Sequence, residues 1–156
     1  MKNSFKPLTL RFSLFGFLIV AAQSFPNIIW ALFPPEMNRL EGNASSILFI
    51  EYAEHILGVA IVVSFLFLAN KTQPNTFPRG AWAITAYVAV AAYWGCWIIY
   101  FMGIQPDLLI YSMVALPPIA FFSAGVAEKV WPIPAISAAF LVFHLLVAAE
   151  NFPIWV

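Results

Sequence analysis

A hydrophobic run over residues 46–69 constrains this chain most, because the run can cross a lipid bilayer and yet contains ionisable side chains. A transmembrane helix needs about 20 mostly apolar residues, and this run is long enough. It also carries Glu51, Glu54 and His55. A charged side chain near the bilayer centre costs roughly 2.5–3.5 kcal/mol on insertion scales. We therefore expect these side chains to face the protein interior rather than lipid.

The spacing of these residues is i, i+3 and i+4, which places all of them on one helix face. Gly58 continues that face and favours the close approach of another helix. Two interpretations remain open. The polar face forms a functional site, as intramembrane ionisable groups commonly do, or it is structural. In the structural case Glu51 reaches interfacial water, and Glu54 and His55 only bond polar groups on neighbouring helices.

Composition extends the membrane prediction to the whole chain. Of the 156 residues, 63% are hydrophobic and 9% are charged, which is too apolar for a soluble domain of this size. The formal net charge is zero, and neither a basic patch nor zinc-finger spacing occurs, so nucleic-acid binding is not predicted. The single cysteine, Cys96, lies within a predicted span, where we expect it to be a small core residue.

The hydropathy pattern predicts an all-α integral membrane protein, a single domain over residues 1–156 that forms a bundle of five transmembrane helices. The predicted spans cover residues 12–33, 46–69, 81–102, 108–127 and 135–151. Val20-Ala21-Ala22 resembles a signal-peptidase site, but the apolar stretch continues to Phe33, so we favour an uncleaved first span. Pro26 should kink the first span, and Pro117-Pro118 should interrupt the hydrogen-bond ladder of the fourth.

Basic residues predict the orientation of the bundle. With the N-terminus in the cytoplasm, six of the seven basic residues fall on the cytoplasmic side, and only Arg39 falls outside. The six are Lys2, Lys6, Arg11, Lys71, Arg79 and Lys129. The positive-inside rule therefore predicts a cytoplasmic N-terminus and an external C-terminus in the plasma membrane.

This topology gathers polar side chains in the outer half of the bundle. The expected pocket is formed by Gln23, Asn27, Glu51, Glu54, His55, Tyr93, Trp97 and His144. The inner half offers little beyond serine and threonine, whereas an open aqueous channel would need a polar lining throughout. Tyr93, Trp97 and Tyr100 share one helix face, which is either a stacking wall for a ligand or ordinary packing with an interfacial aromatic belt.

Two glutamates and two histidines could ligate a metal ion, but motifs such as H-E-x-x-H are lacking, so neither a metal site nor another cofactor is predicted. A Glu–His pair could also perform acid–base chemistry on a lipid or small molecule. The chain contains no G-x-S-x-G motif that would mark a nucleophile. Proton-coupled transport would use Glu54 or His55 as the titrating group.

Several short motifs resemble a group of small bacterial multi-pass membrane proteins that are known mainly as uncharacterised sequences. The motifs are Phe25-Pro26-Asn27-Ile28-Ile29-Trp30 followed by Phe33-Pro34-Pro35, the pair Glu51 and Glu54 with Gly58, and Trp97-Ile98-Ile99-Tyr100-Phe101 with Gly103-Ile104. The resemblance spans most of the chain. It implies a bacterial plasma-membrane setting and no particular activity.

Three functions are therefore compatible with the sequence. The favoured one is binding or transport of a small molecule through an outward-facing polar pocket. This function favours a protein that is not an enzyme. The second is a membrane-embedded enzyme acting on a lipid-like substrate. The third is a non-catalytic immunity or assembly factor whose polar residues hold helices together. The expected partners are the lipid bilayer and a small-molecule or lipid-like ligand. The sequence leaves the oligomeric state open.

Overall fold

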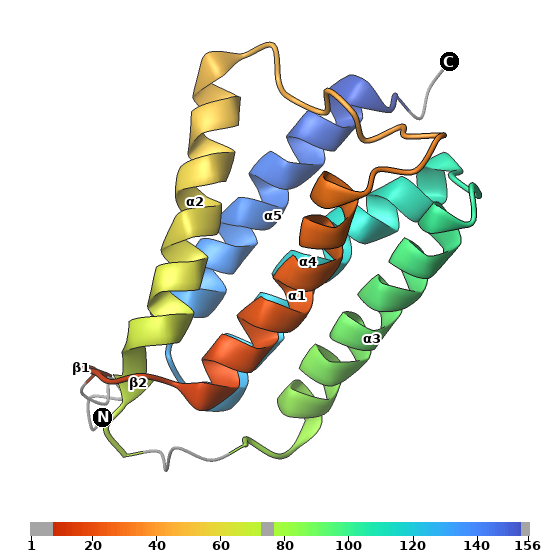
Figure 1. Ribbon diagram of the computed structural model, residues 1–156. Coiled ribbons are helices and arrows are strands. Elements are labelled where there is room, and N and C mark those ends of the chain that lie inside the picture. Colours follow the sequence, from red (N-terminus) through yellow and green to blue (C-terminus); the bar gives the residue numbers. More distant parts are fainter. Residues whose placement is uncertain (1–7, 73–76, 154–156) are drawn as a thin grey trace.

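The computed structural model describes residues 8–72 and 77–153, and over these residues the chain forms five α-helices and one two-stranded sheet (Figure 1). The elements are β1 (Leu8–Leu10), α1 (Leu14–Leu32), α2 (Leu48–Phe67), β2 (Leu68–Asn70), α3 (Ala81–Phe101), α4 (Asp107–Glu128) and α5 (Pro132–Asn151). Each helix is long and apolar enough to cross a membrane. The predicted helical class and its multi-pass character are confirmed to that extent.

Helix α4 forms the centre of the bundle. In its most apolar stretch 61% of the residues are buried, far more than in any other described helix. Helices α3 and α5 pack along α4, α2 packs on α5, and α1 lies across α2, α3 and α4 (Figure 1). Short connections at 102–106 and 129–131 hold α3, α4 and α5 together as antiparallel neighbours.

The small sheet is a feature that the sequence interpretation did not include. Leu8–Leu10 pairs antiparallel with Leu68–Asn70, so the predicted second span, residues 46–69, is too long at this end. Two further backbone bonds, from Arg11 to Phe67 (2.9 Å) and from Ser13 to Leu66 (3.2 Å), continue the pairing up to the start of α1. Ser13 then caps α1, because its Oγ accepts the N–H of Gly16 at 2.9 Å.

We call this the hairpin end of the bundle, and the opposite end, with the 33–47 connection and the α3–α4 turn, the loop end. Arg11, Lys71, Arg79 and Lys129 belong to the hairpin end, and Arg39 belongs to the loop end. Lys2 and Lys6, which also entered the orientation prediction, lie outside the described residues.

Apolar side chains fill the hairpin half of the bundle. They form one buried cluster, made of Phe15, Ile19, Val20, Ile61, Phe65, Ala86, Phe121, Ala124, Val130 and Ile133. The buried hydroxyl of Ser137 bonds back to the carbonyl of Ile133 (2.8 Å), so it remains within its own helix. Toward the hairpin end, this buried cluster of described residues thus forms a packed apolar layer.

The expected interruption at Pro117-Pro118 does not end a helix, because α4 runs through both residues. Helix α1 likewise runs through Pro26. What proline removes is the backbone donor, so the carbonyl of Ala22 has no α-helical partner at position 26. The indole Nε1 of Trp94 donates to that carbonyl at 2.9 Å, and the Phe25 ring stacks on Trp94 at 5.6 Å.

We expect Trp94→Phe to lower the free energy of unfolding by about 1–3 kcal/mol, because it leaves the Ala22 carbonyl without a hydrogen-bond donor. The matched control is Trp82→Phe on the same helix. Trp82 is half exposed and packs on Phe122, and its indole N–H has no hydrogen bond to a described residue. Thermal unfolding in detergent measures both. Equal losses in the two variants would contradict the role assigned to the Trp94 bond.

Candidate functional site

A cavity of about 390 Å³ lies in the loop half of the bundle. Each of the helices α1 to α5 contributes to its lining, together with the 33–47 connection. The lining residues are Asn27, Trp30, Leu40, Asn43, Glu51, Glu54, His55, Tyr93, Trp97, Met113, Val114 and His144. A volume of this size falls within the range of small-molecule sites in proteins.

The structure brings seven of the eight predicted pocket residues to this cavity, and the exception is Gln23. Gln23 is 3% exposed on α1, one turn before Asn27. Neither its amide oxygen nor its amide nitrogen has a hydrogen-bond partner among the described residues. Gln23 therefore shares a helix face with Asn27 but lies one turn further from the cavity.

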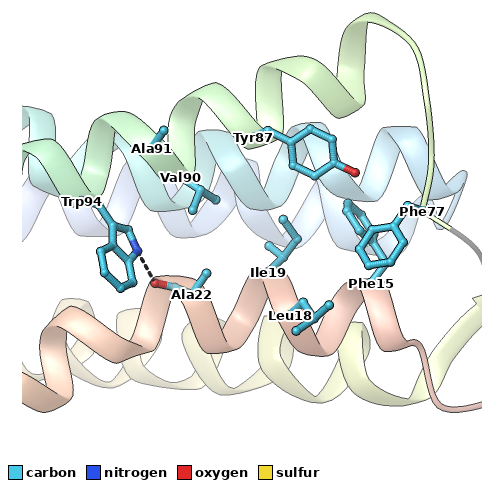
Figure 2. A pocket seen from close by; sticks show the side chains of 9 residues that line it. All are labelled: Phe15, Leu18, Ile19, Ala22, Phe77, Tyr87, Val90, Ala91 and Trp94. Carbon is cyan, nitrogen blue, oxygen red and sulfur yellow. Dashed lines mark hydrogen bonds between the residues drawn. The ribbon is translucent and has the colours of Figure 1, made fainter.

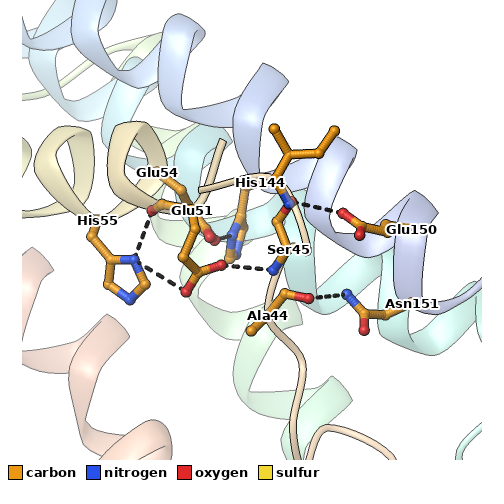
Figure 3. A network of polar contacts seen from close by, with 9 residues as sticks. Ala44, Ser45, Glu51, Glu54, His55, His144, Glu150 and Asn151 are labelled. Atoms are coloured by element: carbon orange, nitrogen blue, oxygen red, sulfur yellow. Dashed lines mark hydrogen bonds and ion pairs between the residues drawn. The ribbon is translucent and has the colours of Figure 1, made fainter. Parts of the chain in front are cut away.

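The polar wall of the cavity begins on α2. The backbone N–H of Ser45 donates to Oε2 of Glu51 at 2.7 Å, and Nδ1 of His55 lies 2.8 Å from the Glu51 carbonyl oxygen and 3.4 Å from its Oε1 (Figure 3). The Glu51 side chain is 22% exposed and the His55 side chain 67% exposed. His55 thus marks the rim of the cavity at the perimeter of the bundle.

The wall continues on α5, where Nδ1 of His144 contacts Oε1 of Glu54 (Figure 3). The His144 side chain is 24% exposed and the Glu54 side chain 14% exposed, so both are largely buried. The Phe140 ring stacks on the His144 imidazole at a centroid distance of 4.8 Å and fixes its orientation. This pair joins residues that are 90 positions apart in the sequence.

Aromatic side chains form the opposite wall. Tyr93 and Asn27 exchange hydrogen bonds of 2.9 and 3.2 Å, and Trp97 packs edge-on against Tyr93 with ring centroids 6.2 Å apart. Trp30 adds a second indole 6.4 Å from Trp97. The buried Nε1 of Trp97 lies near the Tyr93 hydroxyl without reaching hydrogen-bonding geometry. Tyr93 and Trp97 are buried packing residues that also line the cavity, so the two sequence interpretations stay open.

Pro117 and Pro118 leave one backbone carbonyl of α4 without its helical donors. The carbonyl of Val114 would bond to the N–H of residue 118 in an α-helix or of residue 117 in a 3₁₀ turn, and proline has no N–H at either position. Val114 is 4% exposed and lines the cavity. A buried carbonyl without helical donors favours a ligand or water that donates to it.

The 33–47 connection covers the cavity at the loop end, and we call it the covering loop. On one side it is held by Asn38, whose Oδ1 accepts from the Trp30 indole (2.7 Å) and from the Tyr100 hydroxyl (2.9 Å). The Tyr100 hydroxyl in turn accepts the Leu40 N–H at 3.0 Å. Tyr100 therefore supports the covering loop rather than the cavity wall that its spacing with Tyr93 suggested.

The α3–α4 turn fastens the same part of the loop. The Gln105 amide nitrogen donates to the carbonyls of Met37 (2.6 Å) and Tyr100 (3.1 Å), while its oxygen accepts the Arg39 N–H at 3.2 Å. Arg39 also pairs with Asp107 at 2.7 Å. The sequence interpretation did not single out Gln105, because one amide in a turn has no distinguishing pattern.

The end of α5 holds the other part of the loop. The Glu150 carboxylate accepts the Ser45 hydroxyl at 2.7 Å and the Ser46 N–H at 2.8 Å, and Asn151 donates to the Ala44 carbonyl at 3.0 Å (Figure 3). Since Ser45 also bonds Glu51, the loop is directly connected to the polar wall.

A second concavity, of about 330 Å³, lies between α1 and α3 (Figure 2). Its lining is apolar except for the Tyr87 hydroxyl and the Trp94 indole, and that indole is already bonded to Ala22. Phe15, Leu18 and Val90 are typical of its walls. This groove offers no chemistry of its own, so the candidate site is the polar cavity.

Fold and site together define a class: a multi-pass helical bundle with an internal cavity that is polar on one wall and aromatic on the other. No family model, curated protein or solved structure matches the chain. The resemblance to small bacterial membrane proteins therefore stays an expectation.

Proposed function

We propose that this protein binds a small molecule in the polar cavity. The supporting observation is the two-sided lining, with Glu51, Glu54 and His144 on one wall and tryptophan and tyrosine rings on the other. Such a combination of apolar surface with a few converging polar groups is typical of ligand sites. The wall is rich in acceptors, so the expected ligand combines a donor or cationic group with an apolar or aromatic body.

The packed apolar layer supports binding over passage through the protein. A transported molecule would have to cross the hairpin half, where Ile61, Phe65 and Phe121 are buried in the described cluster. Transport therefore requires that the helices separate. The exposed rim at His55, between α1 and α2, supports access from the side of the bundle instead.

We also propose the orientation with the N-terminus in the cytoplasm and the C-terminus outside, in a bacterial plasma membrane. The basic residues at the hairpin end support it, since cytoplasmic segments carry an excess of lysine and arginine. In this orientation the cavity lies in the outer half of the membrane, under the covering loop.

Catalysis on a lipid-like substrate is the second candidate, and the Glu54–His144 contact favours it. A carboxylate that orients an imidazole is a frequent acid–base arrangement. The third candidate, an immunity or assembly factor, needs no ligand at all. In that case filling the cavity would leave the phenotype of the cell unchanged as long as the helices still assemble.

The test uses the cavity-filling variant Asn43→Trp in the covering loop. Its matched control is Ala44→Trp, because Ala44 is the exposed next residue and does not line the cavity. Each protein is extracted from membranes into polymer-bounded lipid discs, and bound small molecules are quantified by mass spectrometry. We expect a molecule that accompanies the wild type and Ala44→Trp to be reduced at least about tenfold in Asn43→Trp, equivalent to 1.4 kcal/mol of binding. Identical profiles for all three proteins would contradict the proposal.

A further inference from the structure

We propose that Glu51, Glu54, His55 and His144 bind a divalent transition-metal ion on the polar wall of the cavity. This inference goes beyond small-molecule binding and does not depend on it, because the ion would occupy only one wall. The sequence alone did not predict such a site, since His144 is remote from the other residues along the chain. The contact of α2 with α5 supplies this fourth ligand.

The candidate ligand atoms lie close enough together to share one ion. Candidate ligand atoms of Glu51, Glu54 and His55 all lie within 4.8 Å of one another. Metal–ligand bonds of about 2.0–2.2 Å place ligand atoms up to about 4.4 Å apart across one ion. Small side-chain rotations therefore bring these groups to a common ion. His144 joins them through its contact with the Glu54 carboxylate.

Charge is the second step. Glu51 and Glu54 bring two carboxylates into one cavity, and no lysine or arginine is among the described residues that line it. Uncompensated charge is costly inside a bilayer, so these carboxylates require protons or a cation. One divalent ion with two neutral imidazoles balances both carboxylates.

The contacts behind these side chains are the third step. Ligands of protein-bound metals are usually oriented by further hydrogen bonds. Glu51 is held by the Ser45 N–H at 2.7 Å, and Nδ1 of His55 is held by the Glu51 carbonyl at 2.8 Å. Phe140 stacks on His144. Coordination by His55 requires its ring to turn, because the nitrogen that faces Glu51 is Nδ1, which is bonded to the Glu51 carbonyl.

The ligand types select the class of metal. Two carboxylates and two imidazoles suit Zn²⁺, Mn²⁺ or Fe²⁺, whereas Ca²⁺ needs six to eight oxygen ligands. A site with these four ligands lies against the aromatic half of the cavity. The cavity of about 390 Å³ leaves space beside the ion for a further small ligand.

The experiment measures metal content and affinity. The protein is purified with a tag that contains no histidine and without chelators, and its metals are determined by mass spectrometry. Co²⁺ is then titrated into metal-depleted protein, and its visible absorption is recorded. We expect about one ion per chain and a saturable Co²⁺ spectrum with nitrogen and oxygen ligands. Glu54→Gln and His144→Ala should each weaken Co²⁺ binding by at least about tenfold.

The controls separate loss of a ligand from loss of the fold. Asp107→Asn removes a carboxylate on α4 that does not line the cavity and is 48% exposed, and it should bind Co²⁺ as the wild type does. His55→Asn acts at the exposed rim, where packing is least affected, and it should change the Co²⁺ spectrum. Circular dichroism checks that each variant is helical. A wild type that binds no metal, or an unchanged spectrum in His55→Asn and Glu54→Gln, would overturn the metal site. Neither result affects the Asn43→Trp comparison.

Discussion

Replacing Gly16 with alanine is expected to lower the free energy of unfolding by about 2–3 kcal/mol. Gly16 lies in the first turn of α1, where the chain leaves the small sheet and passes the end of α2. A Cβ at this position would overlap the carbonyl oxygen of Phe65 and lie 3.1 Å from its ring. Overpacking a core costs about 1–3 kcal/mol even where side chains can adjust. Here the obstacle is a backbone atom, so α1 itself must shift.

Gly95→Ala is the matched control for this prediction. Gly95 is also within a helix, and no described atom lies within 4 Å of an added Cβ. Alanine favours helix over glycine by about 0.5–1 kcal/mol, so Gly95→Ala should be neutral or stabilising. Thermal unfolding in one detergent compares the two variants. A stabilising effect of Gly16→Ala would show that α1 and α2 are not held at this distance in the membrane.

Hydropathy predicted the helices because a bilayer imposes one requirement on every span, a long apolar segment. The element ends were less accessible. Leu68 and Ala69 are apolar enough to extend α2, and only the pairing of residues 68–70 with Leu8–Leu10 shows that they form a strand. Pro117-Pro118 was predicted to interrupt the hydrogen-bond ladder, and α4 nevertheless continues through both residues. Proline removes donors, but packing on both sides of α4 holds the helical path through them.

Side-chain pairing was only partly accessible from the sequence. The i, i+3, i+4 spacing predicted that Glu51, Glu54 and His55 share a face, because that relation is local to one helix. The partnership of Glu54 with His144 depends on α2 packing against α5, which hydropathy does not encode. Gln23 shares a helix face with Asn27 but does not line the cavity, because it lies one turn earlier in α1.

The two parts of the candidate site differ in the same way, because one depends on local spacing and the other on contacts between distant segments. The polar wall on α2 comes from a local pattern, and it was predicted. The covering loop comes from contacts between distant segments, and it was not. Asn38, Tyr100 and Gln105 hold the loop through hydrogen bonds that join residues more than 60 positions apart. The loop covers the cavity at this end, so these residues determine whether the cavity is closed there.

Gln105→Leu should therefore have the second large effect, a loss of about 3–5 kcal/mol in the free energy that holds the covering loop closed. Gln105 is 6% exposed, and its side chain makes hydrogen bonds to the backbone of Met37, Arg39 and Tyr100. Leucine has a similar size but neither donates nor accepts. Each hydrogen bond contributes about 0.5–1.5 kcal/mol, and more where its loss leaves a buried group without a partner. Hydrogen–deuterium exchange over residues 37–45 measures the opening, and we expect it to accelerate by at least about a hundredfold.

Asp107→Asn provides the contrast at the same end of the bundle. It removes the charge that pairs with Arg39, but the Asp107 and Arg39 side chains are 48% and 38% exposed. Exposed ion pairs contribute about 0–1 kcal/mol because water screens them. Exchange over residues 37–45 should thus rise less than about fivefold. If Asp107→Asn opened the loop as much as Gln105→Leu, the loop would be held by its surface charge. If neither variant changed exchange, the contacts with α5 would suffice, and Glu150 rather than Gln105 would control the cavity.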